Sequence, residues 1–325
     1  MKKKISLIGT ATIDLIVKSQ EISIHQEHEA LKLGAKLEVD LAILSFGGGA
    51  MNIAASLSSW GLRPKIFVSL GKDEIGEIIF HKLKKMKIGA KVFWRQGHSP
   101  LSVVVLSPSG ERTILVYRGV SGYFTKKDLS QIPQNQDLYY VGTGQIKAND
   151  LYLFLKRVKR KENFIVVNPS KIFYADPNLK KTLTYIDFLI LNDEEFKLLQ
   201  KNLGFENIKE ISSYNPSLTL IITRGEKNGY IFYQEKIYSF KPYQIDKVLD
   251  KTGAGDAFIS GFIYALLSSK EINIDSINLG VSLGSYNAVS VIQKFGAQNG
   301  ILKFKELKKV KPLFIKEINQ NEFEI

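Results

Sequence analysis

Residues 250–258 contain the side chains best suited to chemistry in this chain. Gly253, Ala254 and Gly255 come directly before an apolar helical pattern, so their backbone N–H groups can approach a phosphate closely at a helix N-terminus. The helix dipole favours negative charge at the same place. Asp256 then falls in the first helical turn, where it can accept a proton from an attacking hydroxyl group. The segment predicts an anion hole beside a general base, although an acid that only stabilises a helix N-terminus would have the same local pattern.

This segment resembles the C-terminal signature of the PfkB, or ribokinase-like, carbohydrate kinases, usually Asp-Thr-x-Gly-Ala-Gly-Asp-x-Phe. Lys251 replaces the usual threonine and leaves the anion hole and the base intact. The P-loop string and the His-Arg-Asp and Asp-Phe-Gly motifs of protein kinases are absent from the sequence. The resemblance implies an ATP-dependent sugar kinase that transfers the γ-phosphoryl group to a hydroxymethyl of a ribose- or fructose-like sugar. Asp256 would be the general base, Gly253, Ala254 and Gly255 would stabilise the developing charge, and both glycines would contact ATP.

Residues nearer the N-terminus and one in mid-chain are predicted to bind the acceptor. Gly47, Gly48 and Asn52 lie in a segment that resembles the family's other signature, Gly-Gly-x-x-x-Asn-x-Ala, although a simple glycine-rich helix entry has the same form. Glycines let the backbone lie flat against a polyhydroxylated ligand, and the Asn52 amide can donate to and accept from hydroxyl groups. Asp14 matches the family position where an early aspartate binds substrate hydroxyls. Gln145 offers another hydroxyl contact, or is a polar loop residue.

Five residues are predicted on the nucleotide side. Asn192 and Glu195 fit the family motif Asn-x-x-Glu, in which the asparagine approaches the phosphates and the glutamate organises Mg²⁺, largely through water. A helix cap followed by a first-turn acid would look the same locally. Thr223, Gly225 and Asn228 resemble the ATP-binding loop Thr-x-Gly-x-x-Gly, with Asn228 in place of the last glycine. We expect the turn to survive because asparagine tolerates left-handed backbone better than most residues.

A monovalent cation site is the least complete part of the resemblance. Asp250, the main-chain carbonyl of Lys251 and Gly296 resemble the segments that enclose K⁺ in some members of the family. The side-chain hydroxyl that usually completes the site is missing at Gly300. Activation by K⁺ therefore stays open, whereas the resemblance implies Mg²⁺ as cofactor and ATP as co-substrate.

Two other functions stay open. Nucleoside kinases of the adenosine type share these signatures, and Tyr117, Arg118 and Tyr123 include aromatic rings that can stack on a base. Aromatic residues in a β lid more often pack or make dimer contacts. A sugar or nucleotide sensor without catalytic activity is the other alternative, but a sensor has no need of Asp256.

The elements that must position these residues alternate along the chain. Short β-branched or aromatic runs predict buried strands at 65–69, 138–141, 164–168, 188–191 and 218–223. Between them, a 3.6-residue period predicts helices at 74–87, 150–161, 193–200 and 255–268. The alternation favours an α/β fold with a mostly parallel sheet and helices on both faces. The resemblance makes this a ribokinase-like three-layer α/β/α sandwich.

Two stretches break the alternation and predict a small antiparallel β lid. Residues 13–17 are expected to pair with 36–44, and residues 101–106 with 112–117. Turn-forming residues at 107–110 favour a hairpin between the second pair.

The domain prediction follows from these pairs. The lid strands are inserted at about 13–45 and 100–119, and we find no internal repeat or long linker. Residues 1–325 are therefore expected to form a single ribokinase-like kinase domain. The resemblance implies that two copies can form a homodimer through the lid.

Composition narrows the class of partner. The chain has 325 residues, 44% of them hydrophobic, and no cysteine, which excludes a disulfide framework. Its net charge of +13 is not accompanied by a recognised nucleic-acid motif. The first apolar run is too short for a secretory signal, and no run is long enough to span a bilayer. We expect a cytoplasmic protein whose partners are a sugar or nucleoside and ATP, not nucleic acid or membrane.

Overall fold

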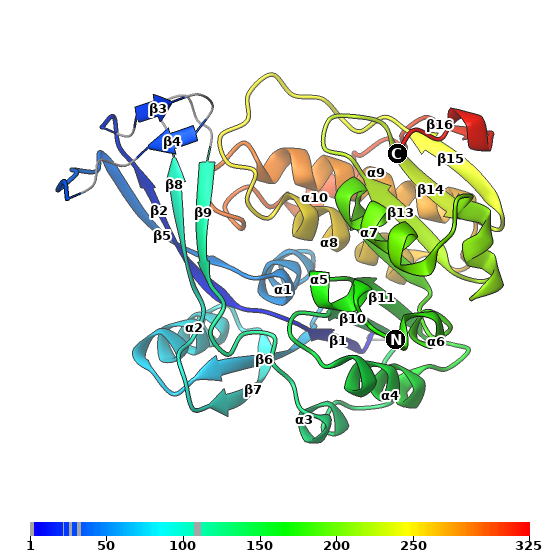
Figure 1. Ribbon diagram of the computed structural model, residues 1–325, viewed down its shortest axis with the longest axis horizontal. Coiled ribbons are helices and arrows are strands. Elements are labelled where there is room, and N and C mark those ends of the chain that lie inside the picture. The colour runs from blue at the N-terminus through cyan, green and yellow to red at the C-terminus, as the bar shows by residue number, and fades with distance from the viewer. Residues whose placement is uncertain (1–2, 22, 26–27, 31–33, 107–111) are drawn as a thin grey trace.

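The computed structural model describes residues 3–21, 23–25, 28–30, 34–106 and 112–325. Its main body is a ten-stranded sheet covered by helices on both faces (Figure 1), so the predicted three-layer sandwich is confirmed. The ten strands are, in chain order, β1 (Ile5–Ile8), β6 (Lys65–Gly71), β7 (Gly89–Arg95), β10 (Leu138–Gly142), β11 (Phe164–Asn168), β12 (Phe188–Asn192), β13 (Thr219–Thr223), β14 (Gly229–Tyr233), β15 (Lys236–Phe240) and β16 (Ile315–Ile318).

The strands lie in the order β16-β15-β14-β13-β12-β11-β10-β1-β6-β7. From β13 to β7 all neighbours are parallel, whereas β14, β15 and β16 form an antiparallel edge. Each of the five predicted strands is present, at β6, β10, β11, β12 and β13. Parallel strands place their carboxyl ends at one edge of a sheet, and residues that follow them therefore meet there.

Two layers of helices bury the two faces of the sheet. One face is covered by α1 (Gly49–Ser59), α2 (Glu74–Lys85), α8 (Ala254–Ser268), α9 (Ile274–Val291) and α10 (Phe304–Leu307). The other is covered by α3 (Lys126–Ser130), α4 (Ala148–Val158), α5 (Lys171–Tyr174), α6 (Leu179–Leu183), α7 (Asp193–Leu203) and the 3₁₀ helix η1 (Ile208–Ser213). The predicted helices are confirmed at α2, α4, α7 and α8. No helix in the described part of the chain is both long and apolar enough to cross a membrane.

Successive side chains of a strand point to opposite faces of the sheet, so each central strand contributes to the hydrophobic cores on both faces. On β10, Tyr140 packs into the core beneath α1 and α8, whereas Tyr139 and Val141 pack into the core beneath α4. Tyr140 thus lies near the carboxyl end of β10, on the face of the sheet that α1 and α8 cover.

A second sheet forms the lid and projects beside the main body (Figure 1). Its strands are β2 (Thr12–Lys18), β5 (Leu41–Gly47), β8 (Leu101–Leu106) and β9 (Arg112–Tyr117), in the order β5-β2-β8-β9. Both predicted antiparallel pairs are confirmed, although β5 occupies 41–47 instead of 36–44. The pairs join through β2 and β8, which run parallel. The predicted turn at 107–110 lies outside the described residues. Two short antiparallel strands, β3 (Ser23–His25) and β4 (His28–Ala30), belong to the same region.

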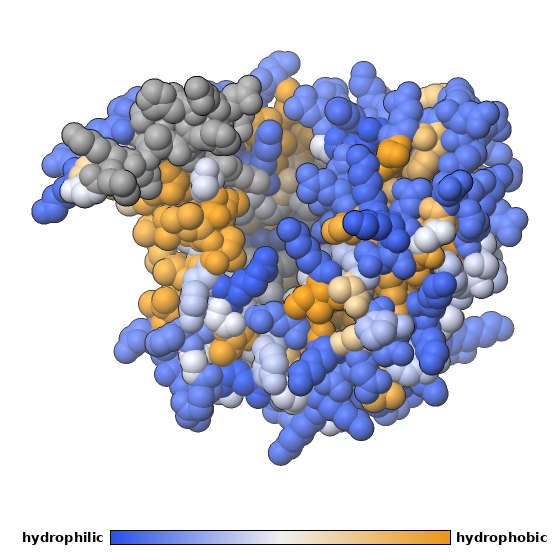
Figure 2. Space-filling view, in the orientation of Figure 1, coloured by the Kyte–Doolittle hydropathy of each residue, from blue (hydrophilic) through white to orange (hydrophobic). Residues whose placement is uncertain are grey.

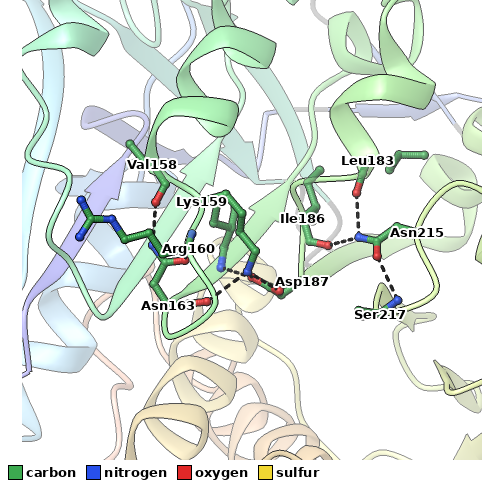
Figure 3. A network of polar contacts seen from close by, with 10 residues as sticks. Val158, Lys159, Arg160, Asn163, Leu183, Ile186, Asp187, Asn215 and Ser217 are labelled. Carbon is green, nitrogen blue, oxygen red and sulfur yellow. Dashed lines mark hydrogen bonds and ion pairs between the residues drawn. The ribbon is translucent and has the colours of Figure 1, made fainter.

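Polar contacts tie the amino ends of β11 and β12 together (Figure 3). Asp187, directly before β12, accepts from Lys159 Nζ at 2.7 Å and from the Ile165 N–H at 2.8 Å. Lys159 also donates to the Asn163 carbonyl at 3.2 Å. Asn215 donates to the Ile186 carbonyl at 2.8 Å. This network holds the edge of the sheet opposite to the carboxyl ends of the strands.

Candidate active site

The predicted base lies where the N-termini of α1 and α8 meet. Asn52, in the second turn of α1, donates from Nδ2 to Asp256 Oδ2 at 2.8 Å. A Cβ added to Gly49 would lie 3.2 Å from Asp256 Oδ1. The two signatures that the sequence analysis singled out, 204 residues apart at this pair, therefore share one site.

The N-terminus of α8 has the backbone that the predicted anion hole requires. Gly253 is its N-cap in the left-handed region, with φ 79°, and a Cβ there would overlap the side chain of Ala297. Gly255 is exposed, and a Cβ there would meet no atom of the described residues within 4 Å. The Ala254 N–H donates to the Lys251 carbonyl at 3.3 Å, so it closes the turn. Free approach to a phosphate thus falls to the backbone of Gly253 and Gly255.

Asp256 is half-buried, and its electrostatic setting suits a base. Burial raises the pKa of its carboxyl to about 6. The hydrogen bond from Asn52 lowers this pKa, and the negative charge of Asp14 raises it. A carboxyl with a pKa near 6 is ionised at neutral pH and still takes up a proton readily.

Asp14 and its neighbours are the residues predicted for the acceptor side. The Asp14 side chain on β2 is buried and accepts from Thr12 Oγ1 at 3.2 Å and from the Ser102 side chain. Burial raises the pKa of its carboxyl. A Cβ on Gly47 would overlap Asp14 Oδ2, and Gly48 has φ 90° with Ala11 and Thr10 against its backbone. Glycine is therefore required at both positions by close packing and, at Gly48, by the positive φ.

A cavity of about 80 Å³ lies between the lid and the main body. Thr12 and Ser102, which both hydrogen-bond to Asp14, line it, together with Tyr117, Arg118 and Gln145. Figure 2 shows the surface hollowed between these two parts of the molecule.

Gln145 has a backbone-holding role in addition to facing this cavity. Its Nε2 donates to the carbonyls of Ser121 at 2.8 Å and Gly119 at 3.2 Å. Both carbonyls belong to the segment after β9, so Gln145 anchors the base of the lid. Tyr123 is packed beside Arg95, whose guanidinium carbon lies 5.7 Å from the ring centroid. Three residues were considered for stacking on a base. Tyr117 and Arg118 line the cavity, whereas Tyr123 is not among its lining residues.

Asn192 and Glu195 cap the start of α7 reciprocally, because each side chain accepts from the backbone N–H of the other residue. Asn192 Oδ1 accepts from the Glu195 N–H at 2.8 Å, and Glu195 Oε2 accepts from the Asn192 N–H at 2.9 Å, which is a capping box. Burial raises the pKa of the Glu195 carboxyl. Asn192 and Thr223 are register partners at the ends of β12 and β13, and Thr223 Oγ1 donates to the Leu191 carbonyl at 3.4 Å.

The loop between β13 and β14 differs from expectation in one respect. Its left-handed residue is Gly225, with φ 61°, and Asn228 does not have a positive φ. The expected tolerance of Asn228 for left-handed backbone is therefore not what preserves this turn. Asn228 instead lines a cavity of about 850 Å³, together with Tyr243 and Phe314.

The residues of the predicted cation site do come together. The buried carboxylate of Asp250 accepts from the Thr252 N–H at 2.8 Å and from the Gly296 N–H at 2.9 Å. Lys251 is exposed. A Cβ on Gly300 would overlap the Ser290 carbonyl, so a side chain that carries a hydroxyl cannot be added there without rearrangement.

The side chains available as metal ligands limit how a metal ion can bind. Within the described residues, no group of three or more His, Asp or Glu side chains is placed to hold a metal ion. Mg²⁺ in phosphoryl-transfer sites usually keeps several waters and takes one or two carboxylates plus substrate phosphates. Glu195, as one carboxylate near the ends of the parallel strands, fits such a water-mediated site.

Sequence reasoning missed two residues of this site. Gln298 Nε2 donates to Asn52 Oδ1 at 3.0 Å. The Tyr140 hydroxyl is 3.2 Å from the position of a Cβ on Gly49, the same position that lies 3.2 Å from Asp256. Gln298 stands in the segment compared with the cation site, but its partner is 246 residues away and local pattern carries no sign of it. Tyr140 looks like any core residue of a buried strand.

Comparisons with known proteins agree over most of the chain. The sequence model described as "pfkB family carbohydrate kinase" matches residues 2–303. A ribokinase from Lactococcus lactis is 28% identical over 96% of this chain and 98% of its own length. A nucleoside kinase from Methanocaldococcus jannaschii is 22% identical over 92% of this chain and 93% of its own. The solved ribokinase structure from Giardia lamblia, 20% identical, covers 95% of this chain and 98% of its own with a TM-score of 0.77, which shows the same fold.

Proposed function

This chain belongs to the pfkB family of carbohydrate kinases, and on that premise we propose that it transfers the γ-phosphoryl group of ATP to a hydroxymethyl group of a small, ribose- or fructose-like sugar. The observation that carries the proposal is the junction of α1 and α8, where Asn52 holds the Asp256 carboxylate beside an accessible helix N-terminus. A carboxyl with a pKa of about 6 and a backbone cradle for phosphate are the two parts that such a transfer needs.

The proposed reaction moves one proton and one phosphoryl group. Asp256 accepts the hydroxyl proton while the hydroxyl oxygen forms a bond to the γ-phosphorus, and the bond from that phosphorus to the bridging oxygen of ADP breaks. The N–H groups of Gly253 and Gly255 stabilise the charge on the phosphoryl oxygens. Bound Mg²⁺ supplies neutralisation of the polyphosphate charge. Glu195 would hold that ion through water, with Asn192, Thr223, Gly225 and Asn228 along the nucleotide.

The acceptor is proposed to lie between the lid and the main body, where Asp14, Gly47, Gly48 and Asn52 bind its hydroxyls. Asp14 already accepts two protein hydrogen bonds, and an ionised carboxylate has further lone pairs for a diol. The lid over this space would exclude water and limit ATP hydrolysis. The proximity of Asp250 to Gly296 supports K⁺ as an activator, bound with the carbonyl of Lys251.

A nucleoside is the second candidate acceptor. Tyr117 and Arg118 line the cavity and can contact a base.

The lid also supports a homodimer. Within the described residues, β9 has β8 as its strand neighbour on one side, and its side chains Ile114, Leu115, Val116 and Tyr117 are 38%, 57%, 53% and 53% exposed. Figure 2 shows apolar residues gathered on this part of the surface. An exposed apolar edge strand of this kind is suited to pairing with a second copy of the same sheet.

An acceptor panel tests the proposal. ADP production would be measured with ATP and D-ribose, D-fructose, fructose phosphates, 2-keto-3-deoxygluconate, adenosine and other nucleosides, and the product identified by mass spectrometry. Turnover with a free sugar, and a phosphate on its hydroxymethyl, is the expected result. Turnover restricted to nucleosides would replace the sugar by the second candidate. Tight binding of one compound with no turnover would contradict a kinase and favour a sensor.

A further inference from the structure

The buried amide of Asn52 joins the predicted base to a loop near the end of the matched region. Asn52 Nδ2 donates to Asp256 Oδ2 at 2.8 Å, and Gln298 Nε2 donates to Asn52 Oδ1 at 3.0 Å. Asn52 lies on α1, Asp256 on α8 and Gln298 in the loop after α9. Two hydrogen bonds thus connect three separate elements through a side chain that is 4% exposed.

The polarity of both hydrogen bonds follows from the ionised carboxylate. Asp256 as a carboxylate can only accept, so the Asn52 atom that faces it must be the amino group. The Asn52 carbonyl then faces Gln298, which must donate. If the Asn52 amide turned by 180°, two acceptors would meet at Asp256 and two donors at Gln298. With its amino group facing the Asn52 carbonyl, Gln298 matches the one orientation of Asn52 that favours the ionised form of Asp256.

The loop that carries Gln298 is itself held firmly against the start of α8. The Gly296 N–H donates to the buried Asp250 carboxylate at 2.9 Å. Asn299 Nδ2 donates to the Phe295 carbonyl at 2.7 Å. Ala297 fills the space where a side chain on Gly253 would be. Gln298 is therefore presented to Asn52 from a fixed position.

Building on the function proposed above, we propose that Gln298 is a positioning residue for phosphoryl transfer, which acts by holding Asn52 in the orientation that keeps the Asp256 carboxylate ionised and aimed at the acceptor. Gln298 does this without contacting the sugar.

This assignment also changes what Asn52 can offer a sugar. Its carbonyl and one of its two amino hydrogens are engaged within the protein, so the second amino hydrogen and the remaining carbonyl lone pair are left for a hydroxyl group. Among the described residues, the titratable groups facing Asp256 are Asp14 from β2 and Tyr140 from β10. Asp14 cannot donate while it is ionised, and within the described residues Asn52 is the side chain that donates to Asp256.

The test compares Gln298→Met with the wild type, using ATP, saturating KCl and D-ribose or whichever member of the acceptor panel is phosphorylated. Methionine keeps the length of glutamine and removes its donor. We expect kcat/KM for the acceptor to fall about tenfold, as for loss of one hydrogen bond in a charged network, with the KM for ATP unchanged. The acidic limb of the pH profile should move to higher pH, because a freely turning Asn52 also accepts from protonated Asp256.

A double-mutant cycle separates positioning from general damage. In an Asn52→Ala background, Gln298→Met should change kcat/KM by less than twofold, because Gln298 acts only through Asn52. Gln293→Met, the same change at an exposed position nearby, should behave as the wild type. Equal effects of Gln298→Met in both backgrounds, or an unmoved acidic limb, would overturn the inference.

Two further measurements keep the result decisive. If Asp256→Asn is inactive but Gln298→Met equals the wild type, only the role of Gln298 is wrong; if Asp256→Asn retains turnover, the proposed function itself fails. Should Gln298→Met not fold, NMR of the wild-type side-chain amides decides. The Asn52 and Gln298 signals should then shift together as Asp256 titrates, and independent behaviour would contradict the coupling.

Discussion

At the scale of single residues, Asp256 combines two properties that oppose each other. Burial disfavours its charge and raises the pKa to about 6, whereas the hydrogen bond from Asn52 stabilises the same charge. A base in this balance is ionised at pH 7 and is still basic enough to take a hydroxyl proton. The same setting makes Asp256 costly to the folded state, which is the usual pattern at a catalytic position.

Replacing Asp256 by Asn should abolish turnover while ligands still bind. The amide cannot accept the hydroxyl proton, so we expect kcat to fall by about 10³-fold or more. The Kd values for ATP and acceptor, measured by calorimetry, should stay within a few-fold of the wild type. Near-normal kcat would contradict the assignment of the base.

The thermal stability of Asp256→Asn shows whether the variant is folded, and the direction of its change can be predicted. The pKa of Asp256 is raised in the folded state, so its ionisation reduces stability as the pH rises through about 6. Asp256→Asn should therefore unfold at a higher temperature than the wild type at pH 7, by a few degrees for about 3 kcal/mol. The difference should vanish below about pH 4, where both side chains are neutral.

The pH dependence of activity follows from the same carboxyl group. Because Asp256 must be ionised to act as base, kcat/KM should fall tenfold per pH unit below about 6. A steady-state profile from pH 4.5 to 8 measures this limb. An acidic limb centred near pH 4 would contradict the raised pKa of Asp256 in the free enzyme.

At the scale of elements, the helix N-terminus of α8 depends on a glycine that two constraints require. Gly253 has φ 79° and has Ala297 against its Cα. Gly255, two residues later, is exposed, and a Cβ there would meet no described atom within 4 Å. Gly253 is therefore needed for the backbone conformation, whereas Gly255 leaves the helix N-terminus open to a ligand.

Gly253→Ala should lower activity by more than its loss of folding stability can account for. The added Cβ would push the loop around Ala297 away from α8, and we expect kcat/KM to fall by about 100-fold through the displaced anion hole. Gly204→Ala is the matched control, because Gly204 has φ 75° and a Cβ there meets no described atom within 4 Å. The control should lose about 1 kcal/mol of stability through backbone strain and keep full activity. Equal activity losses would contradict the role of the close approach.

The amino edge of the sheet should contribute to stability without affecting catalysis. Lys159→Met removes the ion pair of the mostly buried Asp187 carboxylate, whose pKa burial already raises (Figure 3). We expect urea denaturation to reveal a loss of about 1–3 kcal/mol with kcat/KM within twofold of the wild type. Lys161→Met, at an exposed neighbouring position, should change neither quantity.

At the scale of the whole molecule, the lid lines the cavity proposed for the acceptor and carries a run of exposed apolar side chains on β9. β2 links the two roles, because Asp14 lies on the same sheet whose outer strand β9 exposes apolar side chains. A dimer formed through β9 would cover this surface and restrain the lid.

Leu115→Lys should disrupt that dimer. A charge on the exposed edge strand opposes strand pairing. We expect light scattering to give twice the chain mass for the wild type and the single chain mass for the variant at micromolar concentration. Ile172→Lys, at an exposed apolar position on α5, should leave the mass unchanged. A monomeric wild type would rule out the lid-mediated dimer.

Local sequence patterns were sufficient to predict the chemistry proposed for residues 253–256. The proposed anion hole and base at 253–256 occupy consecutive positions, and the strands and helices follow from periodicity, so short-range rules were enough to predict them. The family resemblance across the chain supplied the fold and the order of the motifs.

Which of these residues come into contact became visible from the three-dimensional structure. The contacts from Asn52 to Asp256 and Gln298 span 204 and 246 residues, and no local pattern encodes contacts at such separation. The pKa of Asp256 likewise depends on burial by distant elements. The sequence left open whether Asn192 caps a helix and suggested a left-handed Asn228, whereas the structure has the cap at Asn192 and the left-handed residue at Gly225.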